Sequence, residues 1–156
     1  MALAGLSTLG VTFGYGVETT TAGEKPAAFS QLTRINQIGA ISLENQQIDA
    51  SALEDLVTKN IAGRADTPGN VGVTINLTDE TKAEWEALIT AYKALTGGKQ
   101  MWFEIIIPNM TESYFFIAQP PQEIPSPEFG QNELLTVEIT LTIVDVKAFD
   151  AKVAFT

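Results

Sequence analysis

The strongest constraint on the fold is a strict two-residue alternation near the end of the chain. Within 135–143 the apolar residues are Leu135, Val137, Ile139, Leu141 and Ile143. The polar residues between them are Thr136, Glu138, Thr140 and Thr142. Successive side chains of a β-strand point to opposite faces, so this pattern predicts a long strand with one buried and one solvated face.

Further segments carry the same β signal. The run 71–77 alternates Val71, Val73, Ile75 and Leu77 with Gly72, Thr74 and Asn76. Segments 100–107 and 113–119 are rich in aromatic and β-branched residues and predict a hairpin around the turn 108–112. Weaker patterns predict strands at about 11–18, 28–35 and 39–48. The fold class is therefore mainly β.

One segment is helical by its spacing. A three-and-four repeat places five residues on one helix face: Trp85, Leu88, Ile89, Tyr92 and Leu95. Thr78 is the expected N-cap, Asp79 and Glu80 suit the positive first turn, and Gly97-Gly98 ends the segment. We expect an amphipathic helix over 79–96 that packs on the sheet, with Trp85 and Tyr92 in the core.

Two connections are long for a compact domain. Residues 49–70 could contain a helical turn at 52–56, and the apolar Leu53, Leu56 and Ile61 predict contact with another surface. Residues 120–132 contain four of the seven prolines, so this stretch is expected to be extended and cannot be an interior strand.

Length and composition predict one domain, residues 1–156. The chain is 45% hydrophobic, and a chain of this size buries roughly 70% of its unfolded surface. With no cysteine and no histidine, it can form neither a disulfide nor a thiolate metal site, and it lacks the commonest general base.

Charge and hydropathy limit the partners. Nineteen acidic against nine basic residues give a net charge of −10, which disfavours tight binding of duplex DNA. The first basic residue is Lys25, so the cationic flank of a signal peptide is missing, and no apolar run of about 18 residues predicts a membrane span. We expect a chain that is soluble and cytosolic when it is made, with no membrane partner.

The motifs that could carry chemistry have simpler explanations. Gly14-Tyr-Gly16 lacks the third glycine of a dinucleotide fingerprint, and Gly97-Gly98-Lys99 follows a helix where a phosphate loop precedes one. Asp79 and Glu80 complement the helix dipole, and Glu138 has no second acid at a definable distance. We therefore expect no catalytic residue, no bound metal and no cofactor. We also expect that the protein is not an enzyme.

The aromatic hairpin has two interpretations. Trp102, Phe103, Tyr114, Phe115 and Phe116 fall on both of its faces. Packing inside the subunit is the simpler one, with one face packed against another subunit as the alternative.

The middle of the chain resembles a known family. The segments 41–48, 51–55, 61–66 and 69–76, followed by the Trp85 helix, resemble the major tail tube protein of long, non-contractile-tailed bacteriophages. The resemblance spans about residues 30–150 and lies in element order and loose motifs. Ala50 departs from it, because such proteins often carry threonine there.

The resemblance implies a β-sandwich or barrel-like subunit and a structural role in a virion tail. Such subunits form rings, usually of six, that stack into a tube through which DNA and the tape-measure protein pass. The implied partners are further copies of the chain, the tape-measure protein, and tail terminator or baseplate proteins. DNA would cross the lumen without specific binding.

The resemblance also assigns roles to residues. Residues 49–70 become the ring-stacking loop, with contacts from Leu53, Glu54, Asp55, Leu56, Ile61, Arg64 and Asp66. Residues 1–10 and 149–156 become arms, anchored by Leu3, Leu6, Leu9, Val153 and Phe155. The polar strand faces become candidate lumen linings: Thr136, Glu138, Thr140, Thr142, Thr74 and Asn76.

Two alternatives stay open. The chain could form the tube of a phage-derived injection or secretion machine. It could also be a β-sandwich ligand-binding or adhesion module, with an aromatic patch at Trp102 and Tyr114.

Overall fold

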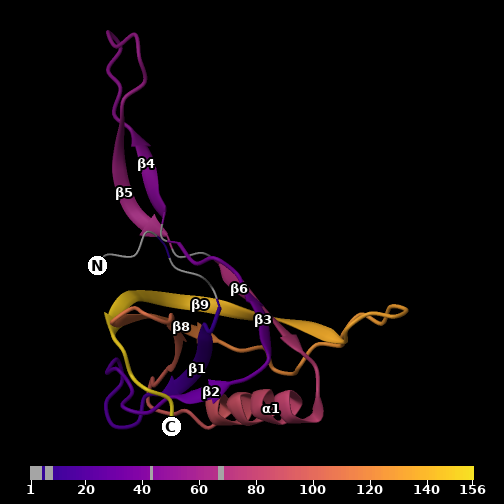
Figure 1. Cartoon of the computed structure of the whole chain (residues 1–156). Coiled ribbons are helices and arrows are strands. Elements are labelled where there is room, and N and C mark those ends of the chain that lie inside the picture. The colour runs from indigo at the N-terminus through magenta and orange to yellow at the C-terminus, as the bar shows by residue number, and fades with distance from the viewer. Residues whose placement is uncertain (1–4, 6–8, 43, 67–68) are drawn as a thin grey trace.

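The computed structural model describes residue 5 and residues 9–42, 44–66 and 69–156. Within these ranges the chain forms nine strands and one helix (Figure 1). In chain order they are β1 (Thr12–Val17), β2 (Ser30–Leu32), β3 (Ile35–Ile38), β4 (Glu44–Asp49), β5 (Asn60–Asp66), β6 (Asn70–Asn76), α1 (Asp79–Lys93), β7 (Met101–Ile106), β8 (Glu112–Gln119) and β9 (Thr136–Ala151). The mainly β fold class is confirmed.

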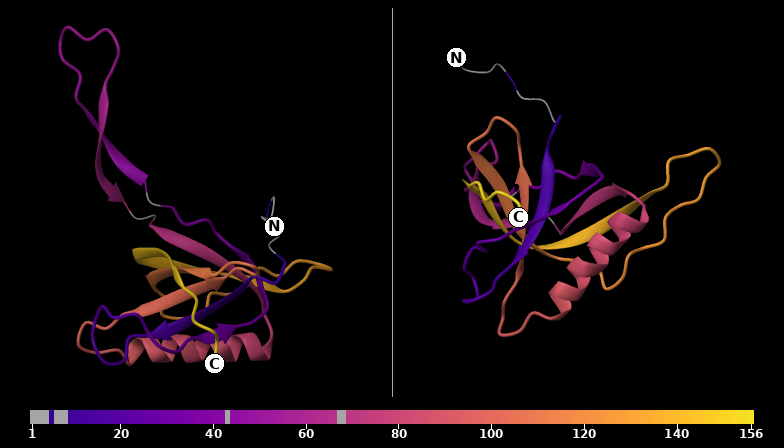
Figure 2. Two further views of the ribbon diagram at one scale, coloured as in Figure 1. Left: turned by 60° about the vertical axis from the view of Figure 1, so that its left-hand side comes forward. Right: turned by 60° about the horizontal axis from the view of Figure 1, so that its bottom comes forward.

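Seven strands form one antiparallel sheet that rolls up toward a barrel (Figure 2). Its order is β2-β1-β7-β8-β9-β6-β3, so β2 and β3 are the two edges. Only Thr33 and Arg34 separate these edge strands in the chain, and Arg34 has a left-handed φ of 57°. Because two residues connect opposite edges of the sheet, the sheet must curl until those edges approach each other.

Helix α1 lies beside β1 and β2 and binds the linker between β2 and β3. Glu84 accepts hydrogen bonds from the Thr33 backbone N–H at 2.9 Å and from its hydroxyl at 2.8 Å. At the N-terminus of the helix, Thr78 and Thr81 form a reciprocal capping box. The predicted N-cap and helix are confirmed, although the helix ends at Lys93, after which the Ala94 N–H donates to the Thr90 carbonyl and the Leu95 N–H donates to the Tyr92 carbonyl three residues back.

The main core fills the inside of the roll. At the centre of this core Trp85 is 0% exposed, and Tyr92 packs at the border of the core, as predicted. The two alternating runs deliver the buried side chains Val71, Val73, Ile75, Val137, Ile139, Leu141 and Ile143. Leu135 is an exception, since it precedes β9 and is 38% exposed.

Several predicted boundaries were wrong. The strand predicted at 28–35 is divided by the turn at Thr33-Arg34 into β2 and β3. Residues 49–70 are not an irregular loop, because most of them belong to the hairpin β4–β5 and its turn. Strand β9 runs on to Ala151 through register shifts against β8, so the predicted C-terminal arm starts inside a strand.

The proline-rich stretch behaves as expected. Residues 120–135 leave the sheet after β8 and form an extended excursion before β9 (Figure 1). In the described part of the chain, no helix is both long and apolar enough to cross a membrane.

Candidate assembly surfaces

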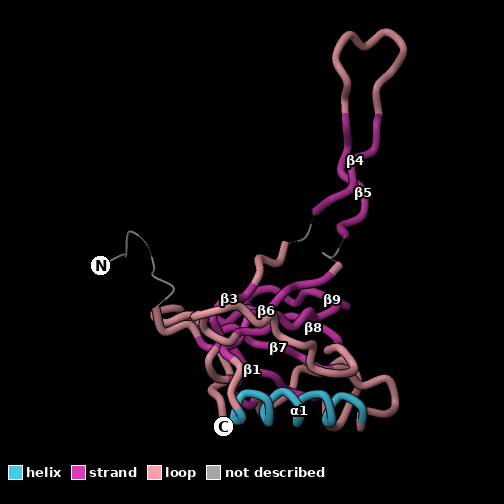
Figure 3. Tube along the Cα trace, turned by 90° about the vertical axis from the view of Figure 1, so that its right-hand side faces the viewer, coloured by secondary structure: helices cyan, strands magenta, loops and turns pink. Residues whose placement is uncertain are grey.

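The most prominent surface is the β4–β5 hairpin, residues 44–66, which we call the arm. It stands away from the rolled sheet, on the side opposite α1 (Figures 1 and 3). Its two strands form a separate sheet and pair with each other, from Glu44 opposite Asp66 to Asp49 opposite Asn60. A register shift between Asn45 and Gln47 interrupts this ladder. The arm is therefore ordered by its own backbone pairing.

The arm exposes apolar side chains. Leu53 and Leu56 are fully exposed, at 106% and 101%, and three more are at least half exposed: Ile48, Val57 and Ile61. Isolated exposed apolar residues are ordinary, but several of them on one projecting element favour an interaction surface. The predicted contact residues Leu53, Leu56 and Ile61 thus all lie exposed on this one hairpin. Glu54 and Arg64 lie on the same arm.

Side chains fix the turn at the tip of the arm. The Ala52 N–H donates to Asp55 Oδ2 at 2.8 Å, and the Lys59 N–H donates to Ser51 Oγ at 2.6 Å. Lys59 Nζ also pairs with Asp55 Oδ1 at 2.9 Å. The Ala52 N–H and Lys59 lower the pKa of Asp55 below its ordinary value. The helical turn considered at 52–56 is absent, because these contacts close a tight turn at 52–55 instead.

A second surface is the polar outer face of β6 and β9. The structure places all six predicted lumen residues on these two neighbouring strands, where Thr74 lies opposite Glu138 and Asn76 opposite Thr136. Glu138 extends over Gly72, where an added Cβ would lie 2.9 Å from its Oε1. None of the six is cationic, so the face offers a phosphate backbone no attractive charge.

The outer face of β1, β7 and β8 is covered by the chain itself. Phe29, Trp102, Phe115 and Ile117 form a second apolar cluster there, and Val153 and Phe155 pack on it. The Thr156 N–H donates to the Phe29 carbonyl at 2.9 Å. The segment predicted as a C-terminal arm therefore folds onto its own subunit. Leu9 is 85% exposed, whereas Leu3 and Leu6 lie outside the described residues.

Two glycines of β1 make this covering possible. A Cβ at Gly14 would lie 2.3 Å from the Phe155 ring and 2.6 Å from the Ser30 carbonyl oxygen. A Cβ at Gly16 would lie 2.6 Å from the Ala28 carbonyl oxygen. The Gly14-Tyr-Gly16 motif thus provides space for aromatic rings and tight strand packing.

The aromatic hairpin packs inside the subunit, as the simpler interpretation expected. Phe103 and Phe116 stack in the main core, and Trp102 and Phe115 belong to the second cluster. Trp102 is 4% exposed, and its Nε1–H donates to Glu18 Oε1 at 2.8 Å. The predicted alternative of a ligand-binding patch at Trp102 and Tyr114 is therefore wrong, because the protein itself already covers the Trp102 indole.

One buried acid lies beneath the C-terminal segment. Glu104 is 0% exposed, and its Oε2 accepts the Val153 N–H at 3.0 Å. Burial raises the pKa of Glu104, while the Val153 N–H and nearby Lys25 and Lys152 oppose that rise. Among the described residues, no group of three or more acids could hold a metal ion.

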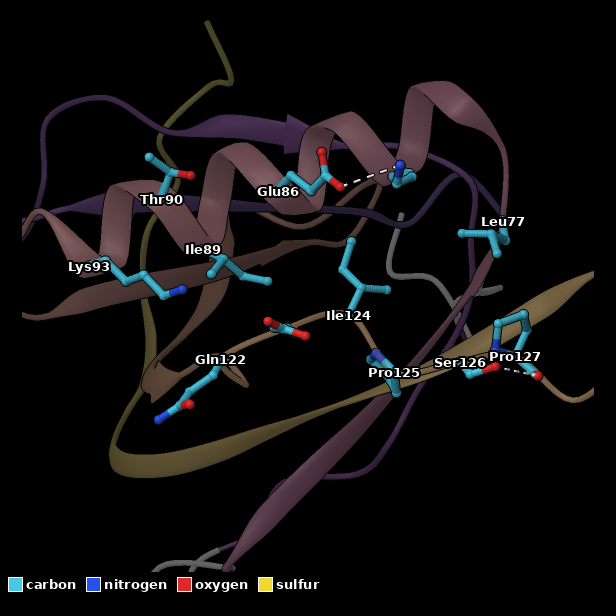
Figure 4. A pocket seen from close by; sticks show the side chains of 12 residues that line it. Leu77, Glu86, Ile89, Thr90, Lys93, Gln122, Ile124, Pro125, Ser126 and Pro127 are labelled. Carbon is cyan, nitrogen blue, oxygen red and sulfur yellow. Dashed lines mark hydrogen bonds and ion pairs between the residues drawn. The ribbon is translucent and has the colours of Figure 1, made fainter.

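A groove beside α1 is the surface that the sequence did not indicate. Its walls are α1 and the proline-rich segment 122–127, and its volume is about 630 Å³ (Figure 4). Ile89 and Ile124 point toward each other across it, and Lys82 and Lys93 lie along the helix side. The available sequence signal is the single apolar Ile124 within the proline-rich stretch, but the groove depends on how this segment returns beside the helix.

Comparisons with known proteins show a similarity in fold to several solved structures. No protein-family model matches the chain, and no curated protein does. Among solved structures, the anti-feeding prophage tube-terminating cap has a chain that matches with a TM-score of 0.64 at 15% identity, covering 97% of this chain and 95% of the other. The sheath/tube terminator of an extracellular contractile injection system, PVC, matches with a TM-score of 0.60 at 14% identity, covering 89% and 93%.

A third match is a chain from the tail of an empty GTA particle with C6 symmetry. Its TM-score is 0.55 at 13% identity, covering 91% of this chain and 95% of the other. The chain has a tail-tube-related fold. The expected similarity to the fold of tail tube proteins is confirmed. The narrower resemblance to the tube protein of non-contractile phage tails stays a prediction.

Proposed function

We propose that this chain is a structural subunit that assembles with copies of itself into the rings and stacked tube of a virion tail or tail-like particle. The observation that carries the proposal is the arm: an ordered hairpin on a tail-tube-related fold whose apolar tip has no partner within the described chain. Burying such a tip against a neighbour would stabilise the assembly by about 25 cal/mol for each Å² of apolar surface removed from water.

The polar face of β6 and β9 is the proposed lumen lining. Thr74, Asn76, Thr136, Glu138, Thr140 and Thr142 would present hydroxyls, an amide and a carboxylate to passing DNA. Without lysine or arginine among them, DNA would slide without being held. Tubes of a Glu138→Lys variant should therefore retain DNA fragments more strongly than wild-type tubes, and equal retention would place Glu138 outside the lumen.

A terminator or cap is the second candidate, because the cap and terminator chains are among the structures that this chain resembles. A terminator ends a tube and does not propagate one. The two candidates therefore differ in the length of what they form alone.

Negative-stain electron microscopy of the purified chain at several concentrations, with light scattering on the same samples, tests the proposal. Long hollow tubes would support the tube subunit, and isolated rings would support the terminator. Uniform monomers at every concentration would contradict self-assembly.

A further inference from the structure

We infer that the proline-rich excursion of one subunit, residues 120–135, seats Phe129 in an apolar hollow of the neighbouring copy in the same ring. This inference rests on the proposed function and goes beyond it by naming the two surfaces that meet sideways. The hollow has a volume of about 790 Å³ and lies between β3 and the adjoining ends of β1, β7, β8 and β9.

The hollow exists because the rolled sheet does not close along its whole length. Edge strand β2 pairs with β1 only at Phe13, Gly14 and Tyr15, so Thr12 has no partner on that side among the described residues. The lining residues come from both sides of this gap, from β1 and its neighbours on one side and from β3 on the other. The interior of the roll is therefore open beyond the last pair of β1 and β2.

Two rows of inward-facing side chains make the hollow apolar. The first row crosses four strands and consists of residues that lie opposite one another: Phe13, Ile105, Tyr114 and Phe149. The second row is Ile35 and Ile38, which share a face because the register against β6 shifts between Ile35 and Gln37. None of the described residues that line the hollow is acidic or basic. A concave apolar space at the mouth of a barrel is a common form of binding site.

The excursion offers the apolar side chain that such a hollow would accept. Phe129 is 76% exposed and Leu134 is 68% exposed, and neither belongs to an apolar cluster of the described residues. Four prolines restrict the backbone of the excursion, and the Glu133 carboxylate lies where a side chain at Gly130 would be. The excursion is therefore shaped before it binds, so docking costs less conformational entropy.

The two surfaces lie on different sides of the body. Strand β8 begins beside the hollow, at Tyr114, and ends at Gln119, where the excursion starts. The excursion extends sideways from the body, whereas the arm rises from it (Figures 1 and 2). With the arm directed toward the next ring, as the resemblance implies, the excursion is directed across its own ring. In a closed ring each copy joins one of its sides to a different side of the next copy, which suits this pair of surfaces.

Charge favours the same pairing. The excursion has no basic residue but has three acidic ones: Glu123, Glu128 and Glu133. The chain has a net charge of −10, so a neighbouring copy would repel this segment except where its surface is uncharged or basic. Arg34 is exposed, directly precedes Ile35 of the hollow and forms no ion pair within the described residues. Seating Phe129 beside Ile35 brings Glu128 toward Arg34, and such complementary pairs set register.

The α1 groove, which lies between α1 and residues 122–127, does not suit Phe129. Glu86 and Glu123 line this groove and would repel the acidic excursion of a neighbour. Ile89 is only 7% exposed, so the groove has little apolar surface to offer on the helix side. The excursion also forms one wall of this groove in its own subunit.

Charge exchange tests the contact in the full-length chain. Glu128→Arg and Arg34→Glu should each raise the concentration needed for assembly by roughly tenfold, a free-energy change of about 1.4 kcal/mol. The double variant should return that concentration toward the wild-type value, because opposite charges face each other again. Glu24→Arg makes the same charge change at an exposed position outside both surfaces and should assemble like the wild type.

Disulfide trapping locates the contact independently, because the chain has no native cysteine. Oxidised assemblies of the Phe129→Cys/Ile38→Cys variant should give a ladder of covalently linked subunits on a denaturing gel. Those of Phe129→Cys/Thr90→Cys, which places the second thiol in the α1 groove, should not.

Three results would overturn the contact while wild-type assembly leaves the proposed function standing. They are a ladder from the second cysteine pair alone, a disulfide of the first pair formed within single chains, and no rescue by the double charge variant. Wild-type chains that stay monomeric at every concentration would instead contradict the proposed function, and the contact with it.

Discussion

The body and the arm use the same apolar residue types in opposite ways. In the body, Phe13, Trp85 and Ile139 are 0% exposed, whereas in the arm Leu53 and Leu56 are fully exposed. Both regions are ordered, the body by packing and the arm by its ladder and the side-chain bonds of its tip. The body therefore buries these side chains within one chain, whereas we propose that the arm supplies apolar surface for a contact between chains.

An isolated two-stranded hairpin is marginally stable in water. This explains why polar contacts concentrate at the tip, where Ser51, Asp55 and Lys59 fix the turn. The arm is held in shape before it meets a partner, so less conformational entropy is lost when it docks.

The largest expected effect separates the two regions directly. Trp85→Ala should lower the free energy of unfolding by about 3–5 kcal/mol, because it leaves a large cavity under α1. Leu53→Ala, the matched truncation in the arm, should change it by less than about 0.5 kcal/mol. Urea unfolding of the monomeric chain measures both, and comparable losses would show that the arm belongs to the folding unit of the body.

A smaller effect on stability concerns the C-terminal segment that packs on the second apolar cluster. Gly14→Ala should destabilise the body by about 1–3 kcal/mol, because the new methyl group collides with Phe155 and the Ser30 carbonyl. Gly69→Ala is the control, since nothing lies within 4 Å of its Cβ position. Thermal unfolding of the two variants measures the difference, and equally mild effects would contradict the tight packing of Phe155 and the Ser30 carbonyl on β1.

The next effect depends on pH. Because burial raises the pKa of Glu104, the folded chain keeps a proton that the unfolded chain releases. Stability from this group is therefore full below its unfolded pKa of about 4.3 and falls as the pH rises through the raised folded value. Glu104→Gln should remove that fall, which urea unfolding at several pH values between 4 and 7 would detect as a flatter curve. An unchanged slope would contradict the burial of this carboxylate.

The smallest effect is local to the arm. Asp55→Ala should leave the melting of the body unchanged and should speed amide exchange at Ala52, whose N–H loses its acceptor. Because the folded pKa of Asp55 is lowered, its contribution is present above the unfolded value of about 3.9 and is lost as the pH falls through the folded value. Hydrogen exchange should therefore show the wild-type tip loosening only below about pH 4. Equal protection at Ala52 in both chains would show that Asp55 does not fix the turn.

Much of the body could be predicted because local periodicity determines it. The alternation around Val137 and Ile139 and the helical spacing around Trp85 each identify the side that becomes buried. The turn at Thr33-Arg34 could not be predicted, because the position of the sheet edges depends on pairings between distant strands.

The candidate surfaces could likewise be predicted only where neighbouring residues in the chain form them. The apolar residues of the arm and the polar lumen candidates can be found in the sequence, since each set follows one or two strands. The α1 groove could not, because Ile89 and Ile124 meet only after residues 120–127 return beside the helix. The packing of Val153 and Phe155 on the body could not be predicted either, because their partner, Phe29, is more than a hundred residues away in the chain.

We propose that the body folds alone and that the tip of the arm drives assembly. The most direct test is electron microscopy of a Leu53→Asp/Leu56→Asp variant beside the wild type, with circular dichroism melting of both. We predict tubes or rings for the wild type, none for the variant at the same concentration, and the same melting temperature for the two monomers. Tubes or rings formed by the variant as readily as by the wild type would contradict this proposal. A clearly lower melting temperature of the variant's body would contradict it as well.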